Sequence, residues 1–215
     1  MLIDWLKFII ALLLLLPPVA LLHGKHTRYR ALMRDWHGYW GRTFSDGSHA
    51  IDLVRAALGA WLMAVALTQA PGARGIAAYL PFITQAAVFA VAAALQTLVC
   101  KEPEAANAPF AFSAGLIIGF LPPLLPGFGP LLTVAFALLL AIVAASGANS
   151  PAAYFPVLSV AVVGLGLVFT QQKLKMALGV VAIASALPWL LTLLFPRHLV
   201  TSYRSRASVS SKPKS

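Results

Sequence analysis

Several uncharged polar side chains lie inside the long apolar runs of this chain, where two different uses are open to them. Five of them are the candidate cavity residues Thr84, Gln85, Gln96, Ser159 and Gln171. Hydroxyl and amide groups form hydrogen bonds without carrying charge, so a cavity that they line suits a neutral or weakly polar small molecule rather than a proton. The same groups also bond one helix to another inside a membrane. The sequence therefore predicts a transport cavity at these residues or a set of interhelical hydrogen bonds.

Few residues of this chain are of a type that could catalyse a reaction. The chain has six acidic residues, all near the ends of apolar runs or in connections, and one cysteine, Cys100. No spacing among the five histidines matches a metal motif such as HExxH, and neither GxSxG nor a glycine-rich phosphate loop occurs. We therefore expect no catalytic residue, no metal site and no cofactor. A membrane-surface enzyme that uses His37, His49 and Asp46 is the remaining catalytic alternative.

Transmembrane helices are the elements that must position these residues. Of the 215 residues, 60% are hydrophobic and 10% are charged, whereas soluble domains carry about 25% charged residues. Apolar runs of about 20 residues recur, and each is long enough to cross roughly 30 Å of hydrocarbon. The sequence predicts an all-α integral membrane protein. The net charge of +10 then reflects residues that flank the spans, so no nucleic-acid partner is expected.

The apolar runs predict about seven transmembrane helices. Pro17 and Pro18 interrupt the first run and should kink that helix or end it early. Residues 119–130 hold four prolines and three glycines, so they form a plain loop between spans or a segment that dips into the membrane. The seven predicted spans are 3–23, 51–69, 76–99, 107–122, 128–146, 153–171 and 176–195.

Basic residues predict the orientation of these spans. The connection 24–50 and the tail 197–215, which we expect to be disordered, carry five Lys or Arg residues each, so both should be cytoplasmic. Six spans separate them, and the two assignments agree. We expect the protein to lie in a bacterial inner membrane with its N-terminus on the outer side. The N-terminal segment 1–23 is expected to be retained as a transmembrane span. The two lysines of residues 171–175 fall on the outer side, against the bias.

A repeated phrase predicts internal symmetry. Residues 72–82 read GARGIAAYLPF, and residues 147–157, which lie 75 positions later, read GANSPAAYFPV, with six of eleven positions identical. If the repeat is real, residues 51–124 and 125–196 each form a unit of three spans. Because three is odd, the second unit enters the membrane in the opposite sense, which is an inverted repeat of the kind found in many secondary transporters. The alternative is that Tyr and Pro are simply favoured at membrane interfaces.

The linker 24–50 has the pattern of an interfacial amphipathic helix. Its aromatic and apolar residues recur at steps of three and four, with arginines on the other faces. Such a helix lies at headgroup depth, where each Arg gains about 1 kcal/mol from an anionic leaflet. The predicted lipid-binding residues are Arg28, Arg30, Arg34, Trp36 and Trp40.

Two further spacings predict helix contacts. Ala111, Gly115 and Gly119 are four residues apart, a small-residue stripe that lets a second helix approach closely, within the chain or in a homo-oligomer or membrane partner. Asp52 and Arg55 are three apart near the start of a span, where they are expected to pair as an interface anchor.

Two functions are consistent with this organisation. The leading expectation is a transporter or channel-like protein for a neutral or weakly polar small molecule. The alternative is a non-catalytic membrane scaffold or assembly factor that binds partner proteins or anionic lipid. Transport predicts a polar cavity between the third and sixth spans, lined by Thr84, Gln85 and Ser159, whereas a scaffold predicts a filled core there.

Overall fold

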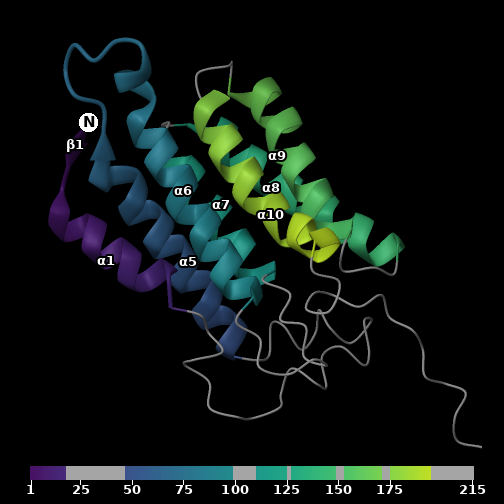
Figure 1. Cartoon of the computed structure of the whole chain (residues 1–215). Coiled ribbons are helices and arrows are strands. Elements are labelled where there is room, and N and C mark those ends of the chain that lie inside the picture. Colours follow the sequence, from purple (N-terminus) through teal and green to yellow (C-terminus); the bar gives the residue numbers. More distant parts are fainter. Residues whose placement is uncertain (18–46, 99–109, 125–126, 149–152, 171–174, 195–215) are drawn as a thin grey trace, which may run out of the picture.

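The computed structural model describes residues 1–17, 47–98, 110–124, 127–148, 153–170 and 175–194. This part of the chain is a bundle of seven helices with one short strand pair (Figure 1), so the prediction of an all-helical fold is confirmed. The helices are α1 (Trp5–Leu15), α5 (Gly47–Ala66), α6 (Ile76–Leu98), α7 (Phe110–Leu124), α8 (Phe128–Gly147), α9 (Tyr154–Phe169) and α10 (Lys175–Leu194). The strands are β1 (Leu2–Ile3) and β2 (Leu67–Thr68).

The helices alternate in direction along the chain. We call the two ends of the bundle the Ala66 end and the Pro17 end, at the top and bottom of Figure 1. Strand β1 pairs antiparallel with β2 at the Ala66 end, and the Asp4 N–H donates to the carbonyl of Ala66 at 2.9 Å. Helix α1 therefore starts where α5 finishes, and the two helices run antiparallel.

Helix α1 is short for a sequence reason. Asp4 caps its start by accepting a hydrogen bond from the backbone N–H of Lys7 at 3.3 Å. Pro18 has no N–H to continue the helix, and the residue before a proline is biased away from helical geometry. The helix ends at Leu15, which leaves 11 residues, about 16 Å of length. The expected interruption is thus observed, and residues 18–23 of the predicted span lie outside the described part.

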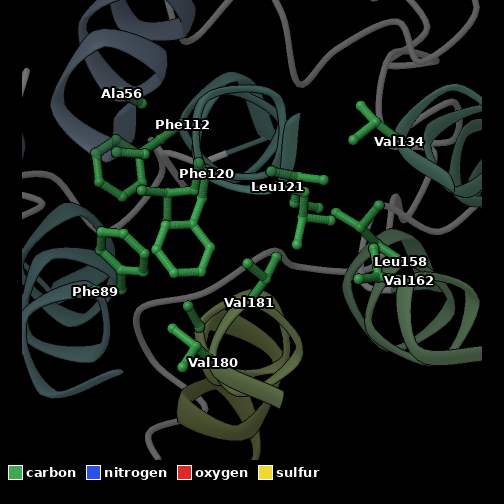
Figure 2. Close-up of a cluster of buried hydrophobic side chains, with 14 of the residues drawn as sticks. Ala56, Phe89, Phe112, Phe120, Leu121, Val134, Leu158, Val162, Val180 and Val181 are labelled. Carbon is green, nitrogen blue, oxygen red and sulfur yellow. The ribbon is translucent and has the colours of Figure 1, made fainter. Parts of the chain in front are cut away.

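Helix α7 is the central helix of the bundle. It packs closely against α5 and also contacts α8 and α10. Apolar side chains from six helices meet around it, and Phe89, Phe120, Leu121, Val180 and Val181 lie together at the centre (Figure 2). The rings of Phe89 on α6 and Phe120 on α7 meet edge to face at a centroid distance of 5.0 Å.

The proline-rich segment 119–130 forms a turn between two helices at its described residues. Pro122 and Pro123 fall in the last turn of α7, and Pro130 falls in the first turn of α8. Gly127 joins them with a φ of +127°, a conformation that favours glycine. Residues 125 and 126 lie outside the described part.

The two predicted three-helix units pack differently. In the first unit, α5 packs mainly against α7, and α6 packs mainly against α10 of the second unit. In the second unit, α8 packs against α9 and α9 against α10. Helices α6 and α9, which carry the repeated phrase, do run in opposite directions, since Gln96 near the end of α6 and Tyr154 at the start of α9 both lie at the Pro17 end.

Candidate functional site

The predicted cavity residues on α6 bond in different directions. The Thr84 hydroxyl donates to the carbonyl of Leu80 on its own helix at 2.9 Å and lies 3.8 Å from the Met1 sulfur. The Gln85 side chain is fully buried and donates from Nε2 to the carbonyl of Met63 on α5 at 3.3 Å. Neither of these hydrogen bonds reaches α9.

Ser159, on α9, lies in a separate interface. Its hydroxyl donates to the carbonyl of Ala182 on α10 at 2.9 Å. Helix α10 packs against both α6 and α9 and so separates the two helices that were expected to line the cavity. The structure therefore does not bring Thr84, Gln85 and Ser159 together, and Gln85 and Ser159 instead form hydrogen bonds between neighbouring helices. Gln171 lies outside the described residues.

Gln96 belongs to a polar cluster at the broken end of α1. Its Nε2 donates to the carbonyl of Pro17 at 3.0 Å and, at 3.4 Å, to that of Leu15. The guanidinium of Arg55, on α5, also donates to the Pro17 carbonyl through Nη1. A helix end leaves carbonyls without partners inside the helix, and these two side chains from α5 and α6 supply the missing donors.

The Arg55 guanidinium is held on three sides. Its Nη2 pairs with Asp52 Oδ1 at 2.9 Å, and its Cζ lies 5.8 Å from the ring centroid of Phe112 on α7. The Arg55 and Asp52 side chains are 8% and 13% exposed. The predicted pairing is confirmed, but the pair lies inside the bundle rather than at its surface, because Arg55 turns inward to reach the end of α1. We name Arg55, Asp52, Gln96 and the Leu15 and Pro17 carbonyls the α1-end cluster.

Sequence reasoning missed the depth of this cluster. Two signals in the sequence point to it: a Pro-Pro pair that must free backbone carbonyls, and an Arg inside the next apolar run. What the sequence did not supply is the antiparallel pairing of α1 with α5. A strand contact between residues far apart in the chain, Leu2 and Thr68, accompanies that pairing.

The predicted small-residue stripe lies at the contact between α5 and α7. A Cβ placed on Gly119 would overlap the backbone carbonyl of Ala57, and one on Gly115 would stand 2.5 Å from the Leu53 carbonyl. Ala111, at the start of the same helix, is half-buried. The stripe thus joins two helices of one chain.

The remaining predicted sites fall outside the described residues. These include the lipid-binding residues Arg28, Arg30, Arg34, Trp36 and Trp40, and His37 and Asp46 of the catalytic alternative. Within the described ranges, His, Cys, Asp and Glu side chains form no group of three or more that could hold a metal ion.

The chain was compared with protein-family models, curated proteins and solved structures, and none of them matches it.

Proposed function

We propose that this chain is a multi-pass membrane protein that acts as a non-catalytic scaffold or assembly factor. The observation that carries the scaffold function is the filled apolar core around α7 (Figure 2). A transporter needs a polar space at the centre of the bundle, and phenylalanine, leucine and valine side chains occupy that position here.

An apolar outer surface supports the membrane location. Helices Ile76–Thr97 and Phe128–Gly147 are long and apolar enough to cross a membrane. Within the most apolar 18 residues of each helix, only 28% and 33% are buried inside the bundle. The core helix of a soluble protein would be mostly buried. Every helix of the described part exposes large apolar side chains, among them Leu13, Leu58, Ile83, Ile118, Leu139, Val168 and Ile183. Such an apolar surface is suited to contact with lipid tails.

Charge supports an orientation with the Pro17 end in the cytoplasm. The connections that leave this end hold five basic residues in 18–46, one in 99–109 and five in 195–215, which is 11 of the 16 in the chain. Lys7, Arg74 and Lys175 lie at the Ala66 end, and Lys173 is in the connection that leaves it. The positive-inside rule then puts the N-terminus outside and the C-terminus in the cytoplasm.

A photo-crosslinking scan tests the scaffold. A photoreactive amino acid is placed in turn at Leu139 on α8, Val168 on α9 and Leu13 on α1, all exposed apolar positions. We expect one helix face to give the same protein adduct in repeated membrane preparations while the other faces give lipid adducts. Lipid adducts at every face would overturn the scaffold function and leave the membrane location standing.

Transport is the second candidate, and one observation favours it. Broken helices with charged or carbonyl groups at their ends mark the substrate sites of many transporters, and α1 ends in such a cluster. Proteoliposomes placed in an inward gradient of urea or glycerol test this candidate. A scaffold leaves the rate of solute entry equal to that of protein-free liposomes, whereas a neutral-solute transporter raises it and the folded Asp52→Leu, Arg55→Leu double variant lowers it again.

A further inference from the structure

The α1-end cluster contains one donor that the described residues do not satisfy. The Nη atoms of Arg55 are bonded to Pro17 and Asp52, but its Nε–H, which is buried, has no hydrogen-bond partner among the described residues. Arg55 as a whole is 7% exposed. A buried N–H without an acceptor costs the full loss of its hydration, so native proteins pair such groups with protein or with ordered water.

The charges of the cluster decide what the missing acceptor can be. Arg55 and Asp52 neutralise each other, and the carbonyl end of α1 adds a partial negative charge. Among the described residues, a further anion at Nε would therefore gain little attraction, which favours a neutral oxygen over phosphate, chloride or a second carboxylate. The acceptor is then a neutral oxygen. The hydrogen on that oxygen can be donated to the Leu15 carbonyl, which accepts from Gln96 only at a long distance of 3.4 Å.

We propose that Nε of Arg55 binds water, in a buried hydration site reached from the Pro17 end of the bundle. Arg55 lies eight residues after the start of α5 at Gly47, about 12 Å along the helix. Further in, the buried Phe89 and Phe120 rings close the path with apolar surface. Gln96 and Phe112 lie within one turn of the described ends of α6 and α7. Water thus enters the bundle from this end, and it stops at the phenylalanine layer. The site rests on the proposed membrane location but not on the scaffold function.

Thiol accessibility tests this site, because only the thiolate reacts with methanethiosulfonates and an apolar environment suppresses its formation. In a Cys100→Ser background, single cysteines replace Gln96 in the cluster, Ala184 in the fully buried apolar core of α10, and Leu58, which is 49% exposed on the outer face of α5. The protein is reconstituted in phosphatidylcholine vesicles, and a small charged methanethiosulfonate is added to both sides. Full labelling after denaturation calibrates each variant.

We expect Gln96→Cys to react at least about tenfold faster than the other two. This result would mean that water reaches the buried position of Gln96, whereas lipid covers the exposed position of Leu58. Equal, slow reaction at Gln96→Cys and Ala184→Cys would overturn the hydration site. Fast reaction at both, with Leu58→Cys protected, would overturn it too, because water would then fill the whole interior. Fast reaction at Leu58→Cys would instead overturn the membrane location.

A second variant assigns the water to the charged pair. Replacing Asp52 and Arg55 together by leucine removes both charges without leaving one unpaired, so the bundle should still fold. We expect the reaction at Gln96→Cys to slow about tenfold in this background because the water loses its partners. An unchanged rate in a variant that elutes as folded protein would show that Arg55 does not hold the water.

Discussion

The two copies of the repeated phrase occupy different environments. Tyr79, near the start of α6, is 45% exposed, whereas Tyr154, at the start of α9, is 2% exposed and meets the ring of Phe110 edge to face at 4.8 Å. The next residues differ in the same way, since Leu80 is exposed and Phe155 is fully buried against Phe110. Similar letters at similar points in two helices therefore do not imply similar contacts.

Helix α7 of the first half and helix α9 of the second also use glycine differently. Gly115 and Gly119 allow α7 to touch the backbone of α5. Gly166 of α9 faces the side chain of Leu178 on α10. Backbone cannot move aside, whereas the end of a leucine can, so these positions of α7 should tolerate much less change than that of α9.

The sharpest test of this difference is Gly119→Leu. The new side chain would have to displace the Ala57 backbone, and we expect no folded protein to be recovered in detergent. The matched control is Gly164→Leu, on α9, where a Cβ added to the glycine would meet nothing within 4 Å. Its melting temperature should stay within about 3 °C of the parent protein. Similar behaviour of the two variants by size-exclusion chromatography would remove the contrast between the halves.

The next largest effect should come from Arg55→Leu. This change removes the guanidinium that pairs with the buried Asp52 carboxylate and removes a donor from the end of α1, so we expect a loss of about 3–5 kcal/mol of stability. The described second half holds one charged residue, Lys175, at the start of α10. The Asp52→Leu, Arg55→Leu double variant should recover most of the loss in chemical denaturation. If it is as unstable as the single variant, the charge of Asp52 is not the cause.

Alanine at the two tyrosines compares the repeated phrases directly. Tyr154→Ala removes a buried ring from the contact with Phe110 and Phe155 and should cost about 3 kcal/mol. Tyr79→Ala, on an exposed position, should change stability by no more than about 0.5 kcal/mol. Thermal melts of both variants measure the difference, and equal losses would mean that the two phrases do hold equivalent places.

The smallest expected effect is that of Gly166→Ala. The added methyl meets only the end of the Leu178 side chain, which can rotate, so we expect a loss of about 1 kcal/mol. Gly119→Ala, with the same added methyl against backbone, should cost more in the same assay. A reversed order would show that the α5–α7 contact is the softer of the two.

The sequence predicted the helices well and their neighbours poorly. Long apolar runs mark where each helix lies, and α8, expected at 128–146, is found at Phe128–Gly147. The stripe of Gly115 and Gly119 also indicated a close helix contact. Which helices meet depends on side chains far apart in the chain, and the Ala- and Leu-rich faces resemble one another too closely to specify partners.

The candidate site was less predictable for a related reason. Ser159 bonds to α10 and Gln85 to α5, and no local pattern distinguishes a hydroxyl that bonds a neighbouring helix from one that lines a cavity. Arg55 was placed near the surface because an isolated helix lets a long side chain reach its end. Its inward direction depends on the carbonyls of α1, which no pattern within α5 reveals.

The separation in sequence between α1 and its partners sets an order for biosynthesis. Leu15 and the side chain that bonds its carbonyl, Gln96, are 81 positions apart. At a synthesis rate of roughly 5–20 residues per second, Gln96 emerges several seconds or more after α1 does. During that interval the carbonyl end of α1 must be covered by water, lipid headgroups or the insertion machinery. Helix α1 is therefore not completed until α6 has been made, and a ribosome that pauses before α6 would leave its end open.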